Sequence, residues 1–452
     1  MGVNSLLDMT ARSLAVYQKA LAVTSNNISN ANSTSYTRQR VLLGPEASEN
    51  FGSLSIGMGV KIVDIQRLKN QALDNQIVKY NSSQSFSEKQ STVISQVESL
   101  YSEPSELGIS NLLSSFLNSW EELTLNPTSA ALRTSVVQNA QNLSVKGQSV
   151  YEGLEEMRTD LGKEADNTVK DVNNYITQLS TLNKQIYEST IVGNSANDLL
   201  DTRDKYIEDL SKLVNINVIM DSDNVANISI GGVYAVGRLS KIEFAAVQEN
   251  GKLQIKTADG NTALNLSGGE LYSLQKSYNT DIKSYQTQLD SVLNSVYDEV
   301  NNLHTTGYTT TDPPETGIKF FESYQNGILV LNNDIVDDVN KIAVSADGSD
   351  GNNEIASKIA SLKTKKLANG LTMSDNYSNL VSSIGYEKVL QDQNAESFDL
   401  VLSQLQEQKS NYSGVSLDEE MVDVLKFQRS YDASAKLIRI ADELLNTLLN
   451  MV

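Results

Sequence analysis

The sequence contains no cysteine and a single histidine, His304, among its 452 residues. Without thiols the chain forms no disulfides and offers no thiolate for catalysis or for a zinc or iron–sulfur site. One histidine also excludes a metal site built from several imidazoles. We therefore expect no cofactor and no metal.

Proline, aromatic residues and long apolar runs are scarce as well. There are 5 prolines, and aromatic residues make up 6% of the chain. No apolar run approaches the roughly 18 residues of a membrane span. The opening stretch, MGVNSLLDMTARSL, lacks the basic and apolar regions of a secretory signal peptide. This composition predicts long, unbroken helices and gives no indication of Sec export.

Positive charge is in deficit. Lysine and arginine total 36 against 56 acidic residues, which leaves a net charge of −20. A surface of that sign repels phosphate backbones and anionic lipid headgroups. Nucleic acid and membranes are therefore not expected as partners.

A heptad-like seam runs along the first 31 residues. Mostly apolar side chains recur in steps of four and three, which is typical of one face of a helix. The seam consists of Val3, Leu7, Thr10, Leu14, Tyr17, Leu21, Thr24, Ile28 and Ala31. An Asn- and Ser-rich cluster over 26–35 then predicts a turn, because such side chains compete with the helical backbone for hydrogen bonds.

The interior shows two periodicities. Helical spacing dominates over 68–101, 107–190 and 271–303, whereas apolar and polar residues alternate between 214 and 266. Turn dipeptides such as Asn250-Gly251 make the alternating stretch a small antiparallel β unit. The predicted fold class is mainly α with a smaller β domain.

Four parts follow from this pattern. Residues 1–60 and 411–452 are expected to form a coiled-coil-like terminal assembly domain. A helical-bundle middle domain takes 61–213, 270–303 and 351–410. The β domain occupies 214–269, and a loop-rich insertion occupies 304–350.

The C-terminal segment repeats the heptad-like pattern. Ser416 and Glu419 have the spacing of a capping box, so a helix is expected to begin there. Steps of four and three then select Leu417, Met421, Val424, Gln428, Tyr431, Ala435, Ile438, Asp442, Leu445, Leu449 and Val452. Leu425 and Phe427 are apolar residues off this seam, so one partner helix cannot cover every apolar side chain.

Ordering this segment costs more conformational entropy than burial of its seam alone returns in free energy. We therefore predict that the two ends are poorly ordered in a free monomer. They should become helical when they pack on each other and on neighbouring subunits.

Two stretches resemble a known family. NNISNANSTSYTRQR, over 26–40, is similar to the N-terminal signature of bacterial flagellar axial proteins. The stretch over 413–449 is similar to their C-terminal signature. NDLLDTRDKYIEDLSKLVNINV, GGELYSLQ and VNNLHTTGY in the interior resemble the flagellar hook-associated protein 1 family. The sequence departs from that family at Ser35, where glycine is usual.

This resemblance implies a structural, non-enzymatic protein that forms a ring between hook and filament. Its expected partners are copies of itself, the hook protein, a second junction protein, the filament and an export chaperone. Its expected location is extracellular, in the flagellum, after export by the flagellar type III system without a cleaved signal.

The resemblance places subunit assembly at both ends. The N-terminal assembly residues would be Leu7, Leu14, Tyr17, Leu21, Asn27, Ile28, Asn30, Asn32, Tyr36, Arg38 and Gln39. The C-terminal residues, which would also hold the chaperone, are Leu417, Met421, Val424, Leu425, Phe427, Gln428, Tyr431, Ala435, Ile438, Leu445 and Leu449. Arg38 could pair with a carboxylate of a neighbouring subunit.

Other interpretations remain open. The seams could be ordinary intrachain core, and the asparagine cluster a solvated turn. The protein could be another axial component, such as a hook or distal-rod protein, while flagellin fits less well. A carboxylate-based hydrolase of cell-wall glycan, using a pair such as Asp201 and Asp204, is a weaker alternative.

Overall fold

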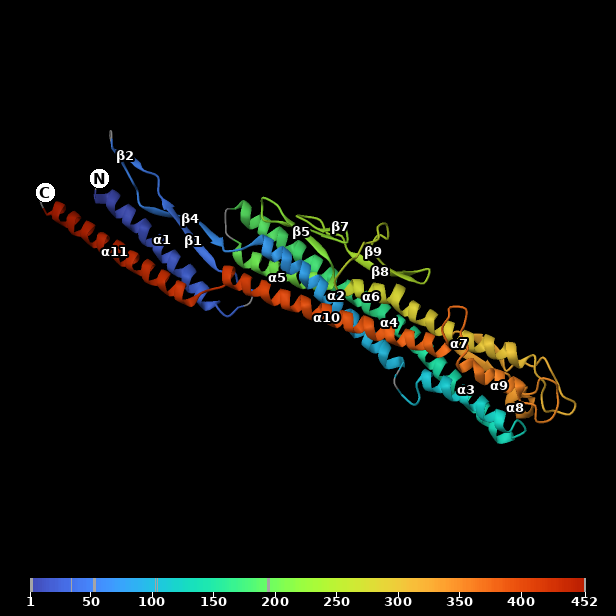
Figure 1. Ribbon diagram of the computed structural model, residues 1–452. Helices are drawn as coiled ribbons and strands as arrows, with labels where there is room; N and C mark the ends of the chain where they lie inside the picture. Colours follow the sequence, from blue (N-terminus) through green and yellow to red (C-terminus); the bar gives the residue numbers. More distant parts are fainter. Residues whose placement is uncertain are drawn as a thin grey trace. The chain divides into compact units, whose positions relative to one another are not determined.

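The computed structural model describes residues 3–33, 35–51, 54–101, 103, 105–192 and 196–450 (Figure 1). Contacts divide the chain into two compact units. Unit 1 comprises Met1–Ser82, Val172–Glu243 and Phe398–Val452, and unit 2 comprises Ser83–Asp171 and Phe244–Ser397. Three long helices, α2 (Gln71–Tyr101), α4 (Ala130–Ile191) and α10 (Met373–Ser413), contribute residues to both units.

Unit 1 contains both terminal helices. These are α1 (Val3–Ser29) and α11 (Leu417–Leu449), which pack on each other (Figure 1). The other elements that lie wholly in this unit are β1 (Gln39–Pro45), β2 (Glu49–Phe51), β3 (Leu54–Ile56), β4 (Val60–Arg67), α5 (Asn197–Leu213), β5 (Ile216–Met220), β6 (Ala226–Ile230) and β7 (Val233–Val236). Strands β1 and β4 pair antiparallel with an irregularity between Leu42 and Leu43, and the hairpin contacts α1.

Unit 2 is a helical body with two hairpins. Its helices include α3 (Ile109–Leu125), α6 (Glu270–Lys276), α7 (Ile282–His304), α8 (Asn333–Asp337) and α9 (Glu354–Ala360), with a π-helical turn at Ser277–Asp281 and 3₁₀ turns at Val339–Lys341 and Ser361–Lys363. Its hairpins are β8 (Phe244–Glu249) with β9 (Lys252–Thr257), and β10 (Phe321–Gln325) with β11 (Ile328–Leu331).

An aromatic cluster forms part of the core of unit 2. Phe116, Trp120, Phe320 and Phe321 are fully buried, with ring centroids 4.9 to 6.4 Å apart. His304 lies in the same cluster and is fully buried. Its Nδ1 lies 2.7 Å from the carbonyl of Ile318, and its Nε2 accepts a hydrogen bond of 2.9 Å from the backbone N–H of Ala343. These two contacts satisfy both nitrogens of the neutral imidazole ring.

The predicted fold class is confirmed, since long helices dominate and the sheets are small and antiparallel. The strands between 214 and 269 form two separate sheets, β5–β6–β7 in unit 1 and β8–β9 in unit 2. The four-part domain division stays a prediction. Among the described helices, none combines the length and the apolar character that crossing a membrane requires.

Candidate functional site

The side of α11 that packs on α1 is a heptad stripe. Its buried and half-buried residues follow steps of four and three: Glu420, Val424, Phe427, Tyr431, Ser434, Ile438, Ala441 and Leu445. Small side chains on both helices, such as Ala20 of α1 and Ala441 of α11, are fully buried in this region. Their size allows two helices to approach closely.

This stripe and the seam expected from the sequence share one position in each heptad. The shared residues are Val424, Tyr431, Ile438 and Leu445. The other expected residues lie off the stripe: Leu417, Met421, Gln428 and Asp442 are exposed and Ala435 is half-buried, while the side chain of Leu449 and the whole of Val452 lie outside the described part. The other position of each heptad in the stripe, at Glu420 and Phe427, lies one residue before the expected Met421 and Gln428. Glu420 is a hydrogen-bonded carboxylate, which a pattern of apolar residues does not select.

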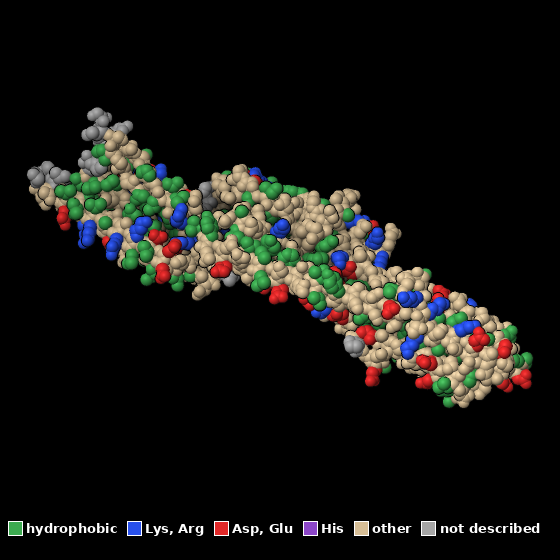
Figure 2. All heavy atoms as spheres, in the orientation of Figure 1, with side chains coloured by type: hydrophobic (Ala, Val, Ile, Leu, Met, Phe, Trp, Pro, Cys, Tyr) green, Lys and Arg blue, Asp and Glu red, His purple; other side chains and the backbone are tan. Residues whose placement is uncertain are grey.

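Large apolar side chains remain on the surface of α11. We call Leu417, Met421, Val422 and Leu425 the proximal patch, and Leu437, Ile440 and Leu444 the distal patch. Their exposed fractions range from 43% to 63%. Figure 2 shows hydrophobic side chains on the surface in the region of the terminal helices. The free chain therefore leaves part of the apolar surface of α11 in water.

The apolar seam of α1 is partly covered throughout. Leu7, Leu14, Tyr17, Leu21 and Ile28 are all half-buried, and Thr10 and Thr24 are buried. The hydroxyl groups of the two threonines donate hydrogen bonds to backbone carbonyls within α1. Seam positions on α1 thus face α11 and the β1–β4 hairpin, the elements that α1 contacts.

The end of α1 is joined to the start of α11 by a polar cluster that we call the clasp: Asn27, Tyr36, Arg38, Gln39 and Glu420. Asn27 is buried, and its Nδ2 donates to Glu420 Oε2 at 2.9 Å and to the carbonyl of Gln39 at 2.8 Å. Its Oδ1 accepts from the Tyr36 hydroxyl at 2.7 Å and from the Gln39 N–H at 3.0 Å. One amide side chain therefore connects three segments of the chain.

Arg38 neutralises the buried carboxylate of the clasp. Its Nε donates to Glu420 Oε1 at 2.6 Å, and its Nη1 also pairs with the exposed carboxylate of Glu419. The Glu420 side chain is only 2% exposed. Burial opposes the charged guanidinium, but the hydrogen bonds from Arg38 to the two glutamates raise the Arg38 pKa overall. The carboxylate that the sequence interpretation assigned to a neighbouring subunit is supplied here within the same chain.

A second ionic cluster lies beside the clasp, on α5. Arg67 Nη2 donates to Asp201 at 2.6 Å and to Asp204 at 2.7 Å, and Lys69 Nζ donates to Asp204 at 2.6 Å. The backbone N–H of Thr37 donates to Asp201 at 3.2 Å, which joins this cluster to residues 36–39. Burial would raise the Asp204 pKa, but the charges of Arg203, Lys69 and Arg67 outweigh it and lower that pKa.

These two clusters also affect Tyr36. Burial of the ring, followed by the negative charges of Asp201, Asp198 and Glu420, raises the Tyr36 pKa to about 12. The phenol therefore stays protonated at neutral pH and remains a donor to Asn27. Asparagines 30 and 32 lie outside the clasp: Asn30 donates to Asn26 within the same turn, and Asn32 is exposed.

The sequence places Glu420 among the acidic residues at the N-terminus of a helix and predicts no contact between it and the N-terminal segment. The acidic cluster at the start of the C-terminal helix was assigned to helix capping, and the Tyr-x-Arg element was assigned to contacts with other subunits. Each of the two signature segments contains a residue of opposite charge, Arg38 and Glu420, and this complementarity could have predicted their contact. Asp201 offered no comparable signal, because its partner in this segment is the backbone N–H of Thr37, which no side-chain type marks in the sequence.

The acidic residues that the sequence offers as candidates for catalysis or metal binding make structural contacts. Asp201 and Asp204, the candidate hydrolase pair, are engaged by Arg67 and its neighbours. In the acidic loop over 347–354, Asp347 Oδ1 accepts hydrogen bonds from Ser345, Ser349 and Asn352. Within the described part of the chain, no cluster of His, Asp or Glu has the arrangement that binds a metal.

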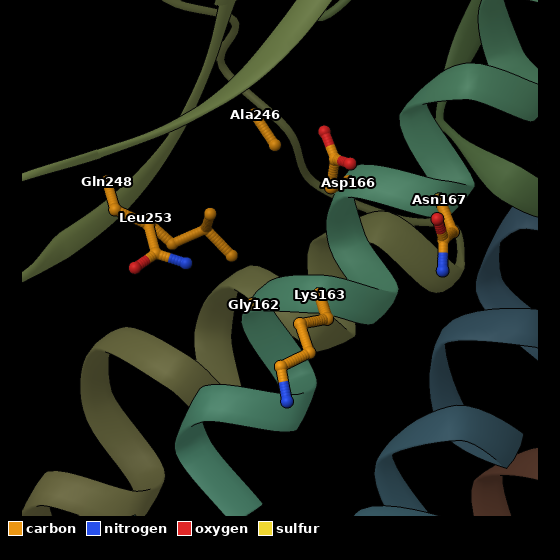
Figure 3. A pocket seen from close by; sticks show the side chains of 7 residues that line it. All are labelled: Gly162, Lys163, Asp166, Asn167, Ala246, Gln248 and Leu253. Atoms are coloured by element: carbon orange, nitrogen blue, oxygen red, sulfur yellow. The ribbon is translucent and has the colours of Figure 1, made fainter.

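A pocket in unit 2 lies between α4 and the β8–β9 hairpin (Figure 3). Its volume is about 440 Å³, and its walls include Gly162 and Asp166 of α4 and Gln248 and Leu253 of the hairpin. Lys163 also lines it, but its amine points away from the hairpin and pairs with Asp160 at 2.8 Å. The pocket is an open polar groove without converging charges.

Comparison with known proteins gives the family. A family model described as the flagellar hook-associated protein FlgK helical domain matches residues 94–321, half of the chain. A second model, the C-terminal region of the flagellar basal body rod FlgEFG proteins, matches residues 406–451, which include the whole of α11.

Curated relatives extend over nearly the whole sequence. Flagellar hook-associated protein 1 of Bacillus subtilis is 29% identical and covers 98% of this chain and 97% of its own length. The protein of the same name from Salmonella typhimurium is 23% identical, and the match covers 99% of this chain and 100% of the relative.

The fold has a counterpart among solved structures. The flagellar hook junction protein FlgK of Burkholderia pseudomallei matches with a TM-score of 0.65 at 14% identity, over 76% of this chain and 100% of that one. Fold, family models and full-length relatives agree. The chain therefore belongs to the FlgK family of flagellar hook-associated proteins and is a structural component of the bacterial flagellum.

Proposed function

We propose that this protein forms the ring that joins hook to filament and that it polymerises through the outward faces of its terminal helices. The observation that carries the proposal is the pair of apolar patches on α11, whose side chains are 43% to 63% exposed. Apolar patches rimmed by polar residues commonly mark protein–protein contacts. One side of α11 packs on α1, so the other is free to pack on neighbouring copies.

The clasp gives this surface a defined position. It fixes the start of α11 against the end of α1 and against residues 36–39, which are in turn held by Asp201 of α5. An interface that repeats in a ring requires the same surface geometry in every copy. The N-terminal residues of the clasp therefore act within the subunit, and the patches act between subunits.

Before assembly most of the apolar surface of α11 needs protection. We expect an export chaperone to cover residues 425–449, because an exposed apolar helix aggregates. Export would use the flagellar type III system without a cleaved signal. In the assembled state the partners would be the hook protein on one side, and a second junction protein and the filament on the other.

The ring proposal is tested in a flagellated strain that lacks its own hook-associated protein 1. A variant with Leu417, Met421 and Val422 replaced by serine changes exposed patch residues outside the expected chaperone dock, so it should be exported and folded, yet should leave hooks without filaments. The matched control replaces Val145, Tyr386 and Val389, which are 66%, 70% and 52% exposed on unit 2, by serine, and should restore filaments. Normal filaments on the patch variant would refute the proposal.

Position in the flagellum separates the proposal from its nearest rival. Labelled protein confined to the hook–filament boundary supports the junction role, whereas label along the whole hook would indicate a hook or rod protein. The chaperone dock has its own test. Deletion of residues 420–452 should abolish binding of the purified export chaperone from the same strain, and unchanged affinity would place the dock elsewhere.

A further inference from the structure

The charged residues of α11 are grouped in blocks along the helix. Acidic residues occupy its start, from Asp418 to Asp423, and its end, at Asp442 and Glu443. The basic block between them consists of Lys426, Arg429, Lys436 and Arg439. All four basic side chains are exposed, and none makes an ion pair with any residue that the structure describes. Figure 2 shows Lys and Arg side chains beside hydrophobic ones along the terminal helices.

The basic block is unusual for this chain. Residues 424–441 contain four cations and one carboxylate, Asp432, whereas the whole chain carries a net charge of −20. An isolated positive surface on an otherwise acidic protein attracts other copies of that protein over distances near the Debye length. On charge alone, the surface that this block fits best is an acidic segment of the same chain.

The position of the block makes its partner part of the interface. The proximal patch precedes Lys426 and the distal patch overlaps Lys436 and Arg439 along α11. If the patches are buried between subunits, the cations between them lose solvent. Removing a cation from water without a carboxylate partner is costly. A contacting surface that supplies carboxylates therefore stabilises the interface more than an apolar surface does.

Suitable carboxylates lie on α11 itself. Glu419 and Glu420 are occupied by Arg38 in the clasp. Asp418, Asp442 and Glu443 are exposed and Asp423 is half-buried, and none of these four has an ion pair among the described residues. Parallel helices in register would place the basic block against the basic block of the neighbour. Only copies that are offset along the helix axis bring acidic ends against the basic middle.

We infer that the basic block of α11 binds the acidic ends of α11 in a second, axially offset copy, and that this charge pairing sets the register of assembly. The inference rests on the proposed polymerisation through the terminal helices. Apolar patches can stabilise contacts between two helices in many registers. Alternating charge blocks stabilise the register that pairs opposite charges and destabilise registers that pair like charges.

The experiment measures self-association of the full-length protein by sedimentation velocity across a concentration series. The reversed variant is K426E/R429E/K436E/R439E, and the complementary variant is D418K/D423K/D442K/E443K. A matched control, K205E/K252E/K319E/K366E, makes the same charge change at exposed lysines outside α11. Circular dichroism verifies that all four proteins keep their helices.

We expect the reversed variant to need a roughly tenfold higher concentration than wild type to associate in about 0.05 M salt, with the difference shrinking near 0.5 M. The control should behave like wild type. An equimolar mixture of the reversed and complementary variants should associate more readily than either alone.

Three results would count against these ideas in different ways. A reversed variant that associates like wild type overturns the charge pairing and leaves polymerisation through the patches intact. A reversed variant that fails to associate and is not rescued in the mixture also overturns the inference, because the basic block would then bind carboxylates of the neighbouring copy other than those at the ends of α11. A wild-type protein that never associates, at any salt or concentration, overturns the proposed polymerisation itself.

Discussion

Removal of Arg38 should be among the most damaging single changes in unit 1. Glu420 is 2% exposed, and its carboxylate accepts hydrogen bonds from Arg38 Nε at 2.6 Å and from Asn27 Nδ2 at 2.9 Å. In the Arg38→Met variant the carboxylate keeps one neutral donor and loses its counter-charge. Stranding a buried carboxylate in this way typically costs about 3 to 5 kcal/mol.

The matched control uses the other partner of the same guanidinium. Glu419 is 64% exposed, so the Glu419→Gln variant removes an ion pair that water screens. Such a pair contributes roughly 0 to 1 kcal/mol. The Glu420→Gln variant keeps the shape of the side chain and leaves Arg38 with Glu419, so its cost should fall between those of the other two.

Amide hydrogen exchange measured by mass spectrometry resolves the effect locally, which suits a chain of two units better than a single unfolding midpoint. Peptides over 36–40 and 417–427 should exchange faster in Arg38→Met and nearly normally in Glu419→Gln. The double variant Arg38→Met/Glu420→Gln should recover part of the loss, since no buried charge remains unpaired. Equal exchange in Arg38→Met and Glu419→Gln would show that the clasp does not hold the two helices.

Three further predictions concern other parts of the chain. Burial of His304, aided by the charge of Arg133, lowers its pKa to about 4 from an ordinary 6.5. Its neutral form therefore contributes stability that is complete above pH 6.5 and is lost as the pH falls towards 4. In urea unfolding of unit 2 at stepped pH, the free energy of unfolding should fall by about 3 kcal/mol more over this range in the wild type than in His304→Gln. Phe427→Ala should destabilise the packing of α11 by about 3 kcal/mol, because the Phe427 side chain is only 8% exposed. Met421 is 59% exposed, so Met421→Ala should cost under about 1 kcal/mol in the monomer and weaken only assembly. Hydrogen exchange of α11 amides measures the first effect, and sedimentation measures the second. Gly147→Ala should cost about 1 to 3 kcal/mol by thermal unfolding, because its new methyl group would lie 2.8 Å from the carbonyl of Gly327.

The sequence predicts the elements of this protein better than their contacts. Helical spacing locates α1, α7 and α11, and alternation with Asn-Gly turns locates β8 and β9, because these signals depend on neighbours a few residues apart. Alternation does not reveal that the strands after α5 divide into two sheets. That division depends on which helices cover each sheet, which local spacing does not encode.

The terminal site shows the same limit at single residues. The steps of four and three in the sequence pass through Val424, Tyr431, Ile438 and Leu445, which are half-buried, and then through Met421 and Gln428, whereas the buried side chains of the stripe are Glu420 and Phe427. A carboxylate is tolerated in a buried stripe only when hydrogen-bond donors satisfy it. Here one donor is Arg38, which lies more than 380 residues earlier in the sequence. The assembly roles assigned to Asn32 and the exposed seam residues stay predictions.

The distance in sequence between the two halves of the clasp has a consequence for when the protein can take its final form. Asn27 and Glu420 are separated by 393 residues. A chain that leaves a secretion channel from its N-terminus would hold the first half of this contact outside long before the second half arrives, and contacts of such range are slow to close. The last segment to emerge would then complete the terminal region, so a truncated or stalled chain would lack the surface through which subunits join.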